Sequence, residues 1–185
     1  MIVFLDFEAS SLADASYPIE VGWVFEDGRS EAYLIRPAPG WDDWDAEAEA
    51  IHGITRSELQ DRGVDHAQVA RRMIEALSGH DLCASAPSWD GKWLSRLLRS
   101  AGFPRHALRL RDTDAVLHEA AYAVLRDVVP RDVLARTVAD LIARCEIGWA
   151  GPTPAHRALA DAEEERQRWL AVCAAAGSLA AGRSG

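Results

Sequence analysis

Two acidic side chains lie close together near the start of the chain. Asp6 and Glu8 are separated by one residue, in and directly after the apolar segment 2–7. If this segment is a β-strand, both carboxylates leave the same face of the sheet, because side chains alternate along a strand. Carboxylates in an apolar setting are costly unless they are paired or bind a cation. The spacing therefore indicates either a cation site or a strand end that emerges into solvent.

Two further acids and a histidine are candidates for the same chemistry. Asp90 opens the predicted helix 89–101, where an acid also has a structural use because it stabilises the helix N-terminus. Asp161 follows His156 by five residues, and five helical residues turn through about 140°. These two side chains therefore converge only if His156 precedes or begins the helix, which two nearby prolines favour. The alternative is that Asp161 belongs to a solvated acidic face.

Five short segments carry these candidates and their neighbours. They are residues 4–12, 17–22, 51–55, 88–90 and 155–162. In this order and at these separations, the segments resemble the DEDDh-type 3′ to 5′ exonucleases of the DnaQ-like superfamily. The resemblance implies a ribonuclease H-like α/β fold. In that fold a mixed five-stranded sheet has the order 3-2-1-4-5, its second strand is antiparallel, and helices flank it.

The resemblance also implies a metal-dependent active site. Asp6, Glu8, Asp90 and Asp161 match the four metal-binding carboxylates of the family, and His156 matches its general base. Two Mg²⁺ or Mn²⁺ ions about 4 Å apart need several oxygen ligands, and they stabilise the attacking and leaving oxygens of a phosphodiester hydrolysis. An imidazole with an ordinary pKa near 6.5 suits removal of a proton from water at neutral pH. The implied reaction releases nucleoside 5′-monophosphates from a 3′ end.

Four residues match substrate contacts of the same family. Leu12 falls where a leucine wedges against the terminal base, and Ser10 with the backbone of Ala9 falls beside the terminal sugar. His52 matches a residue that borders the nucleotide pocket. The alternatives are a core position for Leu12 and a helix cap for His52.

Two departures from the family pattern affect the expected grip on the substrate. Ser11 stands where a glycine is common, and residues 85–87 are Ser-Ala-Pro where His-Asn-Ala is common. Neither departure involves a predicted metal ligand.

A basic segment follows Asp90. Residues 91–111 contain six lysines and arginines and no acid. Arg96 and Arg99 are three positions apart on the predicted helix 89–101, so they point the same way. We predict that they contact the phosphates of a substrate strand. The alternatives are a homodimer surface that presents cations to the partner's site, and an ordinary solvated face.

The predicted elements are arranged so that they can bring these residues together. Strands at 18–26 and 31–36 extend the first strand into an antiparallel meander, with Asp27 and Gly28 at a hairpin turn. Further strands are predicted at 81–86 and 108–111, and helices at 45–51, 56–61, 66–78, 89–101, 114–126, 131–145 and 156–176. This order is typical of an α/β fold whose mixed sheet has helices on both faces.

Length and composition set the remaining limits. The 185 residues predict one exonuclease domain, 1–177, and a flexible C-terminal tail, 178–185. A net charge of −9 taken alone argues against a nucleic-acid partner, because such affinity depends on cations that neutralise phosphates, but the basic segment is a local exception. Three distant cysteines exclude a disulfide framework and a standard zinc knuckle.

The sequence contains no sign of a membrane or secretory segment. The chain start lacks a basic region, and no apolar stretch reaches the ~18 residues of a membrane helix. We therefore expect a cytoplasmic protein without membrane contact. The predicted function is 3′ to 5′ hydrolysis of single-stranded DNA or RNA. The alternatives are a catalytically silent module that binds nucleic-acid ends, and an oligoribonuclease-like enzyme restricted to short RNA.

Overall fold

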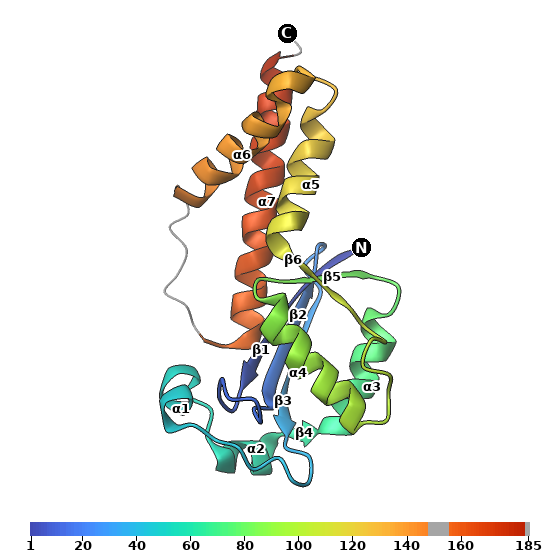
Figure 1. Ribbon diagram of the computed structural model, residues 1–185, viewed down its shortest axis with the longest axis vertical. Coiled ribbons are helices and arrows are strands. Elements are labelled where there is room, and N and C mark those ends of the chain that lie inside the picture. The colour runs from blue at the N-terminus through green and yellow to red at the C-terminus, as the bar shows by residue number, and fades with distance from the viewer. Residues whose placement is uncertain (148–155, 184–185) are drawn as a thin grey trace.

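A six-stranded mixed sheet forms the centre of the molecule (Figure 1). The computed structural model describes residues 1–147 and 156–183. The strands are β1 (Ile2–Ala9), β2 (Pro18–Phe25), β3 (Ser30–Arg36), β4 (Val64–Asp65), β5 (Asp81–Ala84) and β6 (Leu110–Asp112). Their order is β4-β3-β2-β1-β5-β6. Only β2 is antiparallel to its neighbours.

The predicted fold class and strand order are confirmed, with one strand more than expected. The additional strand, β4, has two residues and pairs with the end of β3. Two residues are too few to produce the alternation by which strands are recognised in a sequence.

Seven helices are present in the described part of the chain. They are α1 (Ala46–His52), α2 (Arg56–Arg62), α3 (His66–Leu77), α4 (Pro87–Ser100), α5 (Thr113–Leu125), α6 (Arg131–Ile147) and α7 (Ala158–Arg183). Side chains of Asp45, Thr55, Asp65 and Asp112 cap four of them by accepting hydrogen bonds from first-turn amides. The described residues include no helix that combines the length and apolar composition needed to cross a membrane.

The alternation of β1 decides which residues share a face. Val3, Leu5 and Phe7 belong to the large apolar core that α3 and α4 complete. Phe4 faces the other way, into a smaller cluster with Ala162 of α7. Asp6 and Glu8 alternate in phase with Phe4, so they lie on the face of the sheet that α7 covers.

A glycine allows α7 to lie directly on the sheet at this point. Gly22 of β2 is paired with Asp6 of β1. A Cβ atom at position 22 would lie 2.3 Å from the backbone nitrogen of Leu159, a distance that no side chain can occupy. The missing side chain therefore brings the first turn of α7 next to Asp6.

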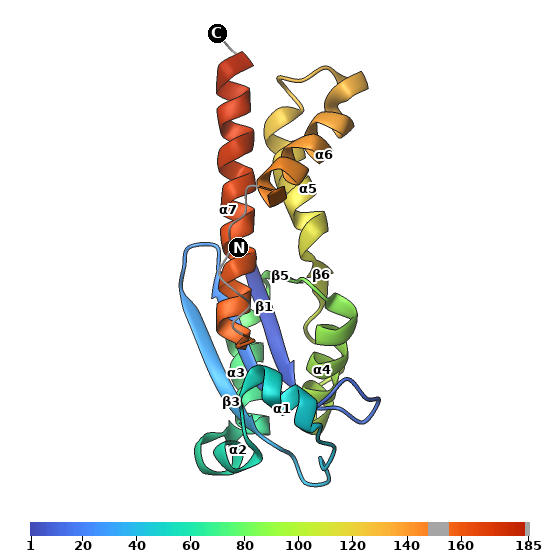
Figure 2. The ribbon, with the colours of Figure 1, turned by 90° about the vertical axis from the view of Figure 1, so that its left-hand side faces the viewer.

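The C-terminal helices extend beyond the sheet as an arm (Figures 1 and 2). We define the helical arm as α5, α6 and residues 172–183 of α7. Its own apolar cluster includes Leu117, Leu134, Leu141 and Val172. We predicted a flexible tail from residue 178, but α7 continues to Arg183. Residues such as Leu179 pack against this cluster.

Candidate active site

Three acidic side chains meet where β1 ends and α7 begins. Asp6, Glu8 and Asp161 each offer a carboxylate oxygen, and these oxygens lie within 4.8 Å of one another. The first two come from one face of β1 and the third from the first turn of α7. The structure thus brings together three of the four predicted metal ligands.

Asp90 borders the same site from the N-terminal turn of α4. Its side chain is 1% exposed, and its Oδ2 atom has no hydrogen-bond partner among residues 1–147 and 156–183. Burial raises the pKa of Asp90 to about 7, although backbone amides, Phe7 first among them, act in the opposite direction. Its charge is among the causes that raise the pKa values of Asp6 and Glu8, so the four carboxylates form one electrostatic unit. We call these four residues the carboxylate centre.

The carboxylate centre is strained by its own charge. Burial, followed by Asp90, Glu8 and Asp161, raises the pKa of Asp6 well above its usual range. Burial and then Asp161 raise the pKa of Glu8 to about 7. Desolvated like charges favour the protonated form unless a cation compensates them. A set of oxygen donors with an unpartnered buried Oδ2 suits a hard divalent ion such as Mg²⁺ or Mn²⁺.

A fifth acid near this centre was missed in the sequence. Glu165 lies one helical turn after Asp161, and its charge also contributes to the raised pKa of Asp6. Burial raises the pKa of Glu165 itself. Arg168 donates to Glu165 at 2.9 Å and also contacts Asp114 of α5 at 3.4 Å. Its position four residues after Asp161 could have indicated Glu165, because residues four apart lie on the same face of a helix.

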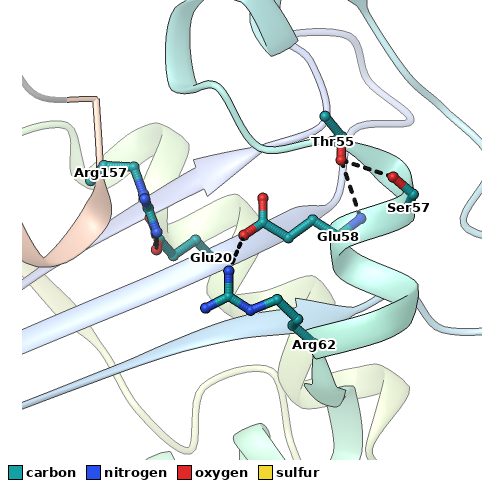
Figure 3. Close-up of polar contacts among 6 residues, drawn as sticks. All are labelled: Glu20, Thr55, Ser57, Glu58, Arg62 and Arg157. Atoms are coloured by element: carbon teal, nitrogen blue, oxygen red, sulfur yellow. Dashed lines mark hydrogen bonds and ion pairs between the residues drawn. The ribbon is translucent and has the colours of Figure 1, made fainter.

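A second missed acid holds the start of α7. Glu20 of β2 is 4% exposed, and its carboxylate accepts hydrogen bonds from Arg157 Nε and from the backbone amide of Ala158, both at 3.0 Å. Figure 3 shows the Arg157 and Glu20 side chains meeting between the start of α7 and β2. Glu20 pairs across the sheet with Glu8. The signal in the sequence was an acid between two apolar residues, Ile19 and Val21, within a predicted strand.

His156 lies immediately before Arg157 and Ala158, the two residues that Glu20 binds. The residue is exposed and has a backbone φ of 46°, in the left-handed region that non-glycine residues rarely adopt. Residues 148–155, which precede it, lie outside the described part of the chain, and they include the two prolines cited above. Glu20 therefore fixes the backbone on the side of His156 that leads into α7.

His52 is buried at the end of α1, in the same neighbourhood. Burial lowers its pKa, and the charge of His156 is among the other causes that act in the same direction. His52 Nδ1 accepts a hydrogen bond from the amide of Ile54 at 3.0 Å. Its Nε2 atom is buried and has no hydrogen-bond partner in the part of the chain that the structure describes. His52 therefore stabilises the turn between α1 and α2 and does not cap a helix, because Gly53 and Thr55 hold the cap positions. Its second ring nitrogen remains available as a donor.

The loop 10–17 presents Leu12 to solvent. Leu12 is 70% exposed, whereas Ala9 is buried at the end of β1. Ser10 is fully buried, and its hydroxyl group donates to Asp43 at 3.0 Å and accepts from the amide of Tyr17 at 3.1 Å. The Ser10 side chain therefore shapes the loop, and the structure does not place it on an open surface beside a substrate.

The two predicted phosphate contacts, Arg96 and Arg99, have different surroundings. Arg96 donates to the carbonyl oxygen of Ser16 at 3.1 Å, and its guanidinium lies 5.4 Å from the centre of the Trp41 ring. Lys92 donates to the carbonyl oxygen of Ala13 at 2.7 Å. Lys92 and Arg96 thus bind the loop 10–17 to α4. Arg99 is exposed and makes no ion pair within the ranges the structure describes.

Solved structures have a similar fold over most of this chain. E. coli exonuclease I in complex with a dA16 oligonucleotide superposes with a TM-score of 0.63 at 18% identity, over 90% of this chain and 39% of that chain. The chain has the fold of exonuclease I. The zinc-bound E. coli exonuclease I complex with single-stranded DNA gives a TM-score of 0.62 at 18% identity, over 90% of this chain and 38% of that chain.

A third similar structure comes from another organism. Exonuclease I of Methylocaldum szegediense gives a TM-score of 0.63 at 18% identity, over 91% of this chain and 40% of that chain. The chain therefore spans about two-fifths of the length of these proteins. No family model and no curated protein matches the sequence.

Proposed function

We propose that the protein is a metal-dependent 3′ to 5′ exonuclease that acts on single-stranded DNA. One observation carries the proposal: Asp6, Glu8 and Asp161 offer oxygens within 4.8 Å of one another beside the buried Asp90, on the fold of exonuclease I. Two similar structures are complexes with single-stranded oligonucleotides. The convergence matters more than the fold, because one fold hosts many functions.

The four carboxylates would hold two Mg²⁺ or Mn²⁺ ions. When bound, such ions lower the pKa of a water molecule and stabilise charge on the leaving oxygen. The carboxylates must lose their protons to bind metal, and their raised pKa values mean that protons are released on binding. Metal affinity is therefore expected to increase with pH between about 6 and 8.

His156 is assigned as the general base. Its exposed ring can accept a proton from the attacking water and return it to solvent. Glu20 supports this role because its carboxylate accepts three hydrogen bonds from the guanidinium of Arg157, the next residue. If His156→Ala loses metal binding together with rate, the histidine is a ligand or a structural residue.

The residues around the centre supply the proposed contacts to the last nucleotide. Leu12 lies exposed on a loop that Lys92 and Arg96 fix, which suits a wedge against the terminal base. His52 Nε2 can donate to the terminal nucleotide, and the backbone at Ala9 borders it. Arg99 remains a proposed contact to the strand. The homodimer and the cytoplasmic location stay predictions.

The direct test is incubation of 5′-labelled DNA and RNA strands with Mg²⁺ or Mn²⁺. We expect stepwise shortening of the DNA strand from its 3′ end, and a loss of more than about 100-fold for Asp6→Ala. The matched control is Asp132→Ala, an exposed acid on α6 without an ion pair in the described chain. Failure to shorten DNA, or equal shortening by Asp6→Ala, contradicts the proposal. Binding without shortening would favour the silent module, and shortening only of short RNA would favour the oligoribonuclease-like enzyme.

A further inference from the structure

The cations of the basic segment 91–111 fall into two groups. Lys92 and Arg96 are engaged with the loop 10–17, as described above. Arg111 donates to Asp81 at 2.7 Å and is therefore neutralised at the edge of the sheet. These three residues have partners within the protein.

The second group has no acidic partner. Arg99, Arg105 and Arg109 are exposed, and none of them pairs with a carboxylate of residues 1–147 or 156–183. Arg105 donates to the ring of His106 at 2.7 Å, a contact that neutralises no charge. A protein with a net charge of −9 therefore keeps a small region of uncompensated positive charge.

Two of these arginines line one cleft. Arg105, His106 and Arg109 form one side of a cleft of about 590 Å³, and Pro87, Gly91 and Ser95 of α4 contribute to the other. The described residues that line the cleft include no acid. Concave surfaces lined by one sign of charge concentrate the potential and attract the opposite charge. Guanidinium groups in particular match pairs of phosphate oxygens.

The cleft lies beside the N-terminal turn of α4, the turn that carries Asp90. Pro87 and Gly91 flank Asp90 in the first turn of α4, and Ser95 lies one turn further on. The eight-residue step from Pro87 to Ser95 corresponds to about 12 Å along the helix. A Cβ atom at Gly91 would meet no atom within 4 Å, so the helix backbone is open at this point. The cleft thus leads away from the site where the strand end would lie.

We propose that this basic cleft binds the phosphates of a single nucleic-acid strand upstream of its 3′ end. The inference rests on the proposed function, because it takes the carboxylate centre as the place of the terminal nucleotide. Arg105 and Arg109 supply the contacts to phosphate. Arg96, by contrast, acts through the loop that carries Leu12.

Binding at different salt concentrations tests the cleft directly. Affinity for a labelled 12-nucleotide strand is measured in EDTA, so that no cleavage occurs, over a series of KCl concentrations. Each phosphate contact to a single strand contributes about 0.7 to the slope of log affinity against log salt. We expect the slope to decrease by about 1.4 in Arg105→Ala/Arg109→Ala. The control is Arg71→Ala/Arg131→Ala, which removes two exposed arginines of α3 and α6 and should leave the slope unchanged.

Cleavage of a dinucleotide separates this inference from the proposed function. A dinucleotide is too short to fill the cleft, so the double variant should cleave it at the wild-type rate while its KM for the 12-nucleotide strand increases. An unchanged slope, absence of wild-type binding, or equal loss on both substrates overturns the inference. If the wild type cleaves nothing but the slope still depends on the two arginines, the cleft stands and the exonuclease proposal fails.

Discussion

The two ends of α7 serve opposite purposes. In its first two turns the helix carries Asp161 and Glu165 toward buried carboxylates that raise one another's pKa values. In its last turns it buries Val172 and Ala176 in the apolar cluster of the helical arm. Buried like charges cost stability, whereas buried apolar side chains supply it. One helix thus combines a destabilising end at the carboxylate centre with a stabilising end in the arm.

Asp6→Asn should have the largest effect, with opposite consequences for activity and for stability. We expect activity to decrease by more than about 100-fold, because a metal ligand is lost. The same change should raise the melting temperature of the metal-free protein, because it removes a carboxylate that burial and four like charges disfavour. Thermal unfolding in EDTA and in Mg²⁺ measures both effects. A lower melting temperature in EDTA would mean that the centre is not strained. Asp132→Asn, in the first turn of α6 in the arm, is the control: it should leave activity unchanged and lower the melting temperature slightly, because an acid near a helix N-terminus is stabilising.

Glu20→Gln should have the next largest effect on activity. The amide cannot pair with Arg157 as a charged partner, so the backbone beside His156 becomes less well fixed. We expect kcat to decrease by about 10- to 100-fold with a smaller change in KM.

Glu31→Gln is the matched control for Glu20→Gln. Glu31 forms a comparable ion pair with Arg72 at 2.6 Å on the neighbouring strand β3, remote from the centre. Equal losses in the two variants would mean that the effect is one of general stability. A shifted acidic limb of the pH–rate profile in Glu20→Gln alone would support a role in positioning the base.

The stability of the metal-free protein should decrease as pH rises. Asp90 has a pKa raised from about 3.8 unfolded to about 7 folded, so its contribution is complete below pH 4 and is lost as pH rises through 7. Glu8, with a folded pKa of about 7, acts in the same sense. The loss from Asp90 is on the order of 4 kcal/mol. Denaturant unfolding between pH 4 and 8 measures it. Saturating Mg²⁺ should reduce the loss, and a metal-free protein that gains stability over this range would contradict the assignment.

Substitutions at two glycines, one packed against the start of α7 and one near its end, should have the smallest effects. Gly22→Ala should destabilise the protein by about 1–3 kcal/mol and reduce activity, because its Cβ would collide with the backbone of Leu159. Gly177→Ala, within α7 in the arm and with open space around it, should stabilise by up to about 1 kcal/mol and leave activity unchanged. Urea unfolding and a rate assay on both variants decide the point. Equal effects would show that α7 does not rest on β2 as described.

Local patterns in the sequence were sufficient for five of the six strands and for the face that carries Asp6 and Glu8. The alternation along β1 predicts that face without knowledge of any distant residue. The partner of Glu20 could not be predicted, because Arg157 is 137 residues away in the chain. The contact between Arg96 and the loop 10–17 depends in the same way on tertiary structure. The end of α7 was missed because its alanines and glycines give no apolar period.

The close approach at Gly22 also has a mechanical consequence. α7 has 26 residues and is about 39 Å long, and it rests on β2 at Leu159, two residues before Asp161. A rigid rod supported at that point has one arm of about 3 Å to Asp161 and another of about 36 Å to Arg183. A displacement of the far end is therefore reduced about twelvefold at the carboxylate. A force that displaces the distal end of the helix should therefore change the position of Asp161 very little.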